Sequence, residues 1–304
     1  MSIQEIAVKE VTLGVTPVNS PDWFSIPIAG SGGLSSTPVK VESNRVRNDL
    51  GVSAGSVVGS DIVGQYPAFE FKADQVDPYY ESVMRGVFTV GVLENGIVLQ
   101  SYSVQRGFDG LTNKYLNYTG AIVTQLDLVF SNVRELVTLS PTFTALTHKS
   151  DAVVSAVGTG AIVAETANRA LTVLDLSNLS LAGLTTLCVQ EGSLSLVNTA
   201  TPRYCAGTAD GVSFDLGNFI LTGTLTVVTT DDSWRFFADK DASTGLPLSF
   251  DLGDGVTSYS HLIPNVQVEF PDPTTVPSGE VVTLQLTMAA FQDEGSYALQ
   301  VTKT

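Results

Sequence analysis

Long runs in which apolar and polar residues alternate one by one constrain the fold of this chain most strongly. Three such runs occupy residues 122–130, 219–228 and 262–270, within expected strands. A period of two is typical of a β-strand with one buried face, so the sequence predicts a mainly β protein. The clearest run places Phe219, Leu221, Leu225 and Val227 on one face and Thr222, Thr224 and Thr226 on the other.

The same rule assigns faces in the other two runs. In the first, it predicts that Ile122, Thr124, Leu126, Leu128 and Phe130 share one face. In the last, it predicts the same for Leu262, Pro264, Val266, Val268 and Phe270.

Helix signals are few. Asp77 followed by Pro78 predicts a helix start with Asp77 as the N-cap, and Tyr80, Val83, Met84 and Val87 then recur at helical spacing. A second candidate helix begins at Asp231 or Asp232 and includes Trp234 and Phe237. The aromatic residues of both segments are expected to anchor a helix on a sheet.

The order of predicted elements recurs, which indicates an internal duplication. Strand, helix and three strands follow one another at 64–74, 77–86, 97–105, 115–130 and 134–146, and again at 217–229, 231–239, 245–252, 256–270 and 279–291. A further strand precedes each copy, at 37–47 and 187–197. We therefore expect two tandem domains of the β-barrel or β-sandwich type, each flanked by a short α-helix. The first spans 1–147, with an N-terminal arm at 1–34 and a long loop of small residues at 50–65; a linker spans 148–186, and the second domain spans 187–304.

The net charge of the chain excludes one class of function. The chain of 304 residues has 15 Lys and Arg against 31 Asp and Glu, a net charge of −16. The part up to residue 147 carries 9 − 14 = −5 and the remainder 6 − 17 = −11. This acidic balance excludes a generic nucleic-acid binder, which needs a basic surface. No apolar run approaches the length of a membrane span, and the first residues lack a signal-peptide pattern, so we expect synthesis in the cytoplasm and no membrane contact.

No motif indicates catalysis, a metal or a cofactor. Cys188 and Cys205 are expected to be half-buried small residues without a disulfide, and His261 is expected to be a strand-pairing residue. The stretch from Asp239 resembles the start of a calcium loop, but Thr244 stands where that loop needs glycine and Phe250 where it needs glutamate. The sequence predicts a protein that is not an enzyme.

With these residues in view, the chain resembles the major tail tube proteins of long-tailed, non-contractile bacteriophages. The resemblance covers about 35–147 and 187–300. It is carried by Val41–Arg47 before the long loop, the helix around Tyr79–Gly86, Tyr102–Gly110, Tyr115–Gly120, Thr222–Thr226 and the closing Leu284–Phe291. It implies a virion protein that stacks as rings into a hollow tube, through which DNA is ejected into the host. A duplicated chain implies a homotrimer with a pseudo-sixfold ring, and a hexamer is the alternative.

The resemblance also implies partners and surfaces. Besides other copies of itself, the partners would be a tape measure protein and tail terminator or tip proteins, and DNA would pass without specific binding. An acidic wall suits that passage, and the candidate lumen-lining acids are Asp127, Glu269, Glu70 and Asp215. The alternative is that these acids face the outer solvent. The loop at 50–65 is either a floppy surface loop or an inter-ring contact that orders against another subunit; its candidate contacts are Gly51, Ser53, Gly55, Gly59 and Asp61.

Two other classes stay open on the sequence. One is a surface-exposed β-sandwich that decorates the tail or binds a receptor. The other is a β-rich hydrolase with paired carboxylates.

Overall fold

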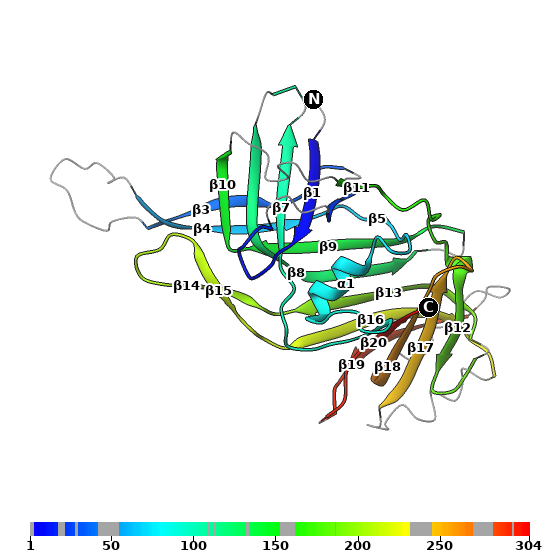
Figure 1. The fold of residues 1–304 in the computed structure, drawn as a ribbon. Coiled ribbons are helices and arrows are strands. Elements are labelled where there is room, and N and C mark those ends of the chain that lie inside the picture. Colours follow the sequence, from blue (N-terminus) through cyan, green and yellow to red (C-terminus); the bar gives the residue numbers. More distant parts are fainter. Residues whose placement is uncertain are drawn as a thin grey trace.

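The chain folds as a mainly β protein, which confirms the predicted fold class (Figure 1). The computed structural model describes residues 3–17, 22–27, 30–41, 55–108, 110–111, 114–131, 134–152, 162–185, 187–231, 245–269, 282–293 and 295–304.

Twenty strands, one α-helix and one 3-10 turn make up the described part of the chain. Up to residue 152 they are β1 (Ile3–Lys9), β2 (Trp23–Ser25), β3 (Ser35–Val41), β4 (Ser56–Gln65), β5 (Phe69–Glu70), α1 (Asp77–Met84), β6 (Val92–Glu94), β7 (Tyr102–Phe108), β8 (Tyr115–Phe130), β9 (Val137–Ala145) and β10 (Thr147–Ala152). After it come β11 (Ile162–Val163), η1 (Val173–Asp175), β12 (Leu176–Leu181), β13 (Val189–Asn198), β14 (Thr201–Tyr204), β15 (Gly211–Asp215), β16 (Phe219–Val228), β17 (Leu246–Gly253), β18 (Ser258–Glu269), β19 (Thr283–Ala290) and β20 (Gln300–Lys303).

A central antiparallel sheet runs through the order β5–β9–β8–β13–β16–β19–β18. One of its faces packs on a large core drawn from both halves of the chain, and α1 belongs to that core. Ser82 of α1 accepts a hydrogen bond from the Val123 amide of β8 and donates one to the Gln100 carbonyl. The helix is thereby tied directly to the sheet.

The same order of strand pairing occurs in both halves. In the first half the antiparallel pairs are β1·β7, β7·β8, β8·β10, β8·β9, β9·β4 and β4·β3. In the second half they are β12·β17, β17·β18, β18·β20, β18·β19, β19·β16 and β16·β13. The halves join edge to edge where β8 pairs with β13, and again where β6 pairs with β20.

The helix α1 differs from its prediction at both ends. Val76 is the N-cap and makes no side-chain capping bond, whereas Asp77 is the first helical residue. The Asp77 carboxylate instead accepts hydrogen bonds from Tyr259 and Lys303. The helix ends at Met84, and its C-cap Arg85 has a φ of 55°, so Val87 lies beyond the helix and is exposed. The second predicted helix lies, from residue 232 on, outside the described residues.

The predicted faces are wrong in part, because β-bulges interrupt two long strands. In β8 the register with β9 shifts between Val123 and Gln125, and in β18 the register with β17 shifts beside Ile263. An extra residue reverses which side chains face the core. The core therefore receives Ala121, Val123, Leu126 and Leu128 from β8, and Tyr259, Ile263 and Val266 from β18, whereas Ile122 joins a small cluster on the opposite face.

Three other expectations need correction. Residues 56–65 of the expected loop form β4, because they pair with β3 and, at their end, with β9. Of the strand expected at 97–105, only the part from Tyr102 is strand, as β7. Both cysteines are exposed rather than half-buried, and neither forms a disulfide.

Two hairpin arms extend from the central sheet on the same side (Figure 1). One is built from β3 and β4 and the other from β14 and β15. The Tyr204 hydroxyl donates to the Asp61 carboxylate at 3.2 Å, which links the arms. The second arm also packs on the first half of the chain, since the Gly211 amide donates to the Leu146 carbonyl.

Candidate functional site

The face of the central sheet opposite the core is the most distinctive surface of the molecule. Directly paired residues form one row across seven strands: Glu70, Thr138, Val129, Ser193, Thr224, Thr287 and Glu269. Side chains that oppose each other across paired strands lie on the same face, so a hydroxyl-rich row ends in a carboxylate at each side. We call this surface the polar face.

The neighbouring rows of paired residues also carry hydroxyl, amide and carboxylate side chains. Asp127 pairs with Ser140 on one side and Ser195 on the other, and Ser195 pairs with Thr222. Thr226 lies between Glu191 and Gln285. These residues are half-buried or exposed, whereas their chain neighbours on the other face are buried. Period-two alternation of Leu with Ser or Thr in β13 and β16 produces this separation locally.

Hydrogen bonds hold the polar side chains of this face in place. The Asp127 carboxylate accepts from Ser195 Oγ at 2.5 Å and from Gln125 Nε2 at 2.9 Å. Ser193 and Thr224 share a hydrogen bond of 2.9 Å across β13 and β16. Thr226 Oγ1 donates to Glu191 at 3.0 Å. These polar side chains are therefore held in place by one another.

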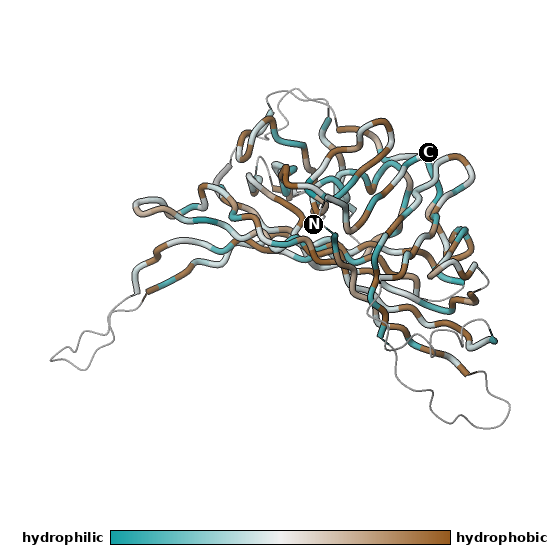
Figure 2. Tube along the Cα trace, turned by 90° about the horizontal axis from the view of Figure 1, so that it is seen from below, coloured by the Kyte–Doolittle hydropathy of each residue, from teal (hydrophilic) through white to brown (hydrophobic). Residues whose placement is uncertain are grey.

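The strands of the polar face contribute negative charge and no positive charge, although Lys72, just beyond β5, lines a pocket with Glu70 and Thr138 at one edge of this face. β5, β8, β9, β13, β16, β18 and β19 contain no Lys or Arg along their full lengths, but they contribute Glu70, Asp127, Glu191 and Glu269. Figure 2 shows the sheet edge-on as an arch, with most of the described chain on its convex side. Because the core and α1 occupy that side, the polar face lies on the concave side.

Three of the four candidate acids from the sequence lie on the polar face: Glu70, Asp127 and Glu269. Asp215 does not, because it lies in β15 of the second arm and forms an ion pair with Arg203. Glu191 was missed, although its alternation with Ser193 and Ser195 places it on the same face. Among the candidate contacts of the 50–65 segment, Gly55 directly precedes β4, and Gly59 and Asp61 lie within it; Gly51 and Ser53 lie outside the described residues.

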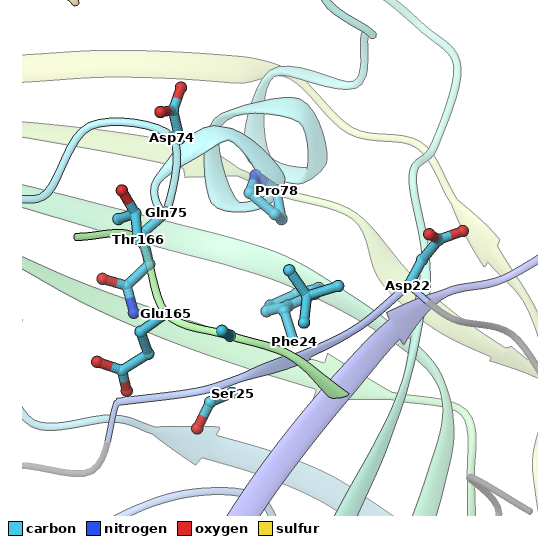
Figure 3. Close-up of a pocket in the computed structure, with 10 residues that line it drawn as sticks. Asp22, Phe24, Ser25, Asp74, Gln75, Pro78, Glu165 and Thr166 are labelled. Carbon is cyan, nitrogen blue, oxygen red and sulfur yellow. The ribbon is translucent and has the colours of Figure 1, made fainter. Parts of the chain in front are cut away.

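A pocket of about 280 Å³ lies between the start of α1, β2 and the segment after β11 (Figure 3). Its three carboxylates, from Asp22, Asp74 and Glu165, lie around different parts of the pocket and do not converge (Figure 3). Asp74 pairs with Lys303 at 2.7 Å, and Glu165 lies 3.9 Å from Lys72. Across the described part of the chain, no three His, Cys, Asp or Glu side chains gather as metal ligands would.

His261 is buried in the core rather than placed in a cleft. Its Nδ1 donates to the Tyr259 carbonyl and its Nε2 accepts from the Tyr80 hydroxyl at 3.0 Å. Its ring stacks on Phe250 with 4.4 Å between centroids. Burial lowers the pKa of His261 to about 4, so the ring is neutral at physiological pH.

Comparison with known families identifies the kind of protein. A family model described as phage tail tube protein matches residues 6–290. The chain belongs to the phage tail tube protein family. No curated protein matches it.

Membership assigns this tail tube protein to a structural family and to the tail of the virion. It also implies self-assembly into a tube. The match spans both halves, and all seven strands of the polar face lie within the matched region, whereas β20 lies beyond it. None of the helices in the described residues is long and apolar enough to cross a membrane.

Proposed function

We propose that this tail tube protein polymerises as stacked rings into a hollow tube and that the polar face lines its lumen as the conduit for DNA ejection. The observation that carries the proposal is the polar face itself: concave, hydroxyl-rich, acidic and free of Lys and Arg along seven strands.

The chemistry of the polar face suits passage of DNA. Each Lys or Arg that contacts a phosphate adds affinity by releasing counterions, and a basic wall would therefore retain the genome. Hydroxyl and amide side chains keep the wall wet, and fixed carboxylates repel the phosphates. DNA would then slide without specific binding, in keeping with the net charge of −16.

A ring of three chains accounts for the repeated strand pairing. Each half presents the same order of strands, so three chains supply six similar sectors. Within one chain the halves join where β13 adds to the outer edge of β8. In β18, Gln267–Glu269 pair with β19 on one side. On the other side, which corresponds to the side of β8 that β13 joins, they pair with no described strand. An unpaired edge is a site for adding another chain, and we assign it to the next copy in the ring. A ring of six whole chains is the alternative.

The other proposed partners follow from the position of a tube in a tail. A tape measure protein would occupy the lumen during assembly, and terminator and tip proteins would close the two ends. Synthesis would take place in the host cytoplasm before assembly.

Electron microscopy of the purified chain tests the proposal. We expect hollow tubes, and image reconstruction is expected to give three chains in each ring with the polar face inward. Six whole chains in a ring would exclude the trimer but keep the conduit. A chain that stays monomeric at high concentration would contradict the proposed assembly and favour a decoration or receptor-binding protein.

A further inference from the structure

Val90 occupies the tip of a tight turn in a conformation that valine rarely adopts. Thr89 and Val92 exchange both backbone hydrogen bonds, and the two residues between them have φ values of 50° at Val90 and 78° at Gly91. Two successive positive φ values define a turn that favours Asn-Gly, whereas a β-branched residue there is strained. Val90 is also 98% exposed, so the folded chain gains nothing from its apolar side chain.

Two other exposed aliphatic residues stand on the same rim of the molecule. Val256, 88% exposed, lies in the turn between β17 and β18, and Leu174, 73% exposed, lies in η1 just before β12. The pairs Leu176–Leu252, Ser258–Thr304 and Lys303–Gly91 place the three turns at one end of the strand order β12–β17–β18–β20–β6. Figure 1 shows the C-terminus beside the end of β17. We call Val90, Val256 and Leu174 the apolar rim.

Side-chain hydrogen bonds hold the turns that carry Val256 and Leu174 in place. The Asp254 carboxylate accepts hydrogen bonds from the Val256 and Thr257 amides at 2.9 and 2.8 Å. Asp175 bonds the Thr172 amide and hydroxyl and pairs with Arg169 at 2.6 Å. A strained residue such as Val90, kept in a turn that two backbone hydrogen bonds close, supports the hypothesis of a functional contact.

The opposite ends of β6 and β20 carry a second set of exposed apolar residues. Ile97 is 79% exposed, and Val98 and Phe291 are also exposed. The Asn95 amide donates to the Leu299 carbonyl, and the Asn95 side chain donates to Gln292, which places this set at the start of β20. Apolar residues therefore stand at both ends of the same strands.

We propose that the apolar rim docks on the Ile97–Val98–Phe291 surface of a second copy of this chain, in the next ring of the tube. A head-to-tail contact between unlike surfaces repeats without closing and so builds an open polymer. Copies that each carry a net charge of −16 repel one another, so contacts between rings need apolar burial to offset that repulsion. This inference rests on the proposed assembly into stacked rings.

The variant Val90→Asn separates assembly from folding, because it relieves the strained turn while removing the apolar contact. We expect its urea midpoint to equal or exceed that of the wild type, and its critical concentration for tube formation to rise about ten-fold. Ile97→Asn, on the opposing surface, is expected to raise the critical concentration similarly. Val11→Asn is the matched control: Val11 is a 71% exposed turn residue outside both surfaces.

The outcomes are distinct. If the wild type forms tubes and Val90→Asn does so at the same concentration, the rim contact is wrong and the proposed function stands. If the wild type forms no tubes, the rim contact and the proposed function are both wrong. Should Val90→Asn lower the urea midpoint, Val256→Asn replaces it, and an unchanged critical concentration for that variant would also overturn the contact.

Discussion

At the scale of single residues, His261 links stability to pH. Its pKa is about 4 in the folded chain against an ordinary value of 6.5, because burial disfavours the charged ring. Well above pH 6.5 the His261 ring is neutral in both the folded and the unfolded chain, so the folded chain keeps its full stability. As pH falls from 6.5 toward 4, the unfolded chain binds a proton that the folded chain does not, and we expect a loss of up to about 3 kcal/mol.

Urea unfolding at pH 7 and pH 5 measures this loss. The variant His261→Gln is expected to be less stable at pH 7 but to lose less on acidification. His148→Gln, which removes the half-exposed second histidine, is the control and should keep the wild-type difference. Equal pH dependence in all three proteins would exclude His261 as the source.

Gly120 is a second residue whose identity the fold requires. Its φ is +63°, and a Cβ there would lie 2.8 Å from Leu146. We expect Gly120→Ala to lower the free energy of unfolding by about 2–4 kcal/mol, from backbone strain plus overpacking. Gly110→Ala is the matched control, because Gly110 has φ +88° but open space around it. A similar loss in both variants would leave strain alone as the cause.

At the scale of elements, β20 fastens the two halves together. It pairs with β18 on one side and β6 on the other, and Lys303 bonds Asp74 and Asp77 at the start of α1. Burial raises the pKa of Asp77, whereas Lys303 and Tyr259 act to lower it. We expect Lys303→Met to reduce the free energy of unfolding by about 1–3 kcal/mol, since it leaves the Asp77 carboxylate with less compensation.

Thermal unfolding compares this variant with Lys149→Met, which removes an exposed cation from the first half. The control should keep the wild-type midpoint. If both variants unfold alike, the ion pairs of Lys303 contribute little and strand pairing alone holds β20.

At the scale of the whole molecule, the charge of the polar face is the property to change. The double variant Asp127→Lys and Glu269→Lys is expected to assemble into tubes and to slow DNA ejection, because phosphate contacts then retain the genome. Glu94→Lys with Asp210→Lys changes the net charge equally at exposed positions outside the seven strands of the polar face and is the control. Ejection rates from phage carrying each variant are the measurement, and the difference should shrink as salt rises. Equal rates would remove the polar face from the transit path.

The sequence by itself determined the mainly β fold class, the longest strands and the acidic balance. Alternation at 122–130 and 219–228 predicts strands that the structure shows as parts of β8 and as β16, because side-chain period is a local property of the backbone. Three of four candidate acids lie on the polar face for the same reason. The resemblance to tail tube proteins, carried by motifs along both halves, agrees with the family match over residues 6–290.

Only the tertiary structure decided which side of β8 and of β18 faces the core on each side of their bulges. The bulges near Thr124 of β8 and Asn265 of β18 arise from register with partner strands, and no local pattern encodes that register. The edge pairing of β8 with β13, and the gathering of Val90, Val256 and Leu174 on one rim, join residues far apart in the chain. Such contacts depend on which strands become neighbours, and that is set by packing of the whole molecule.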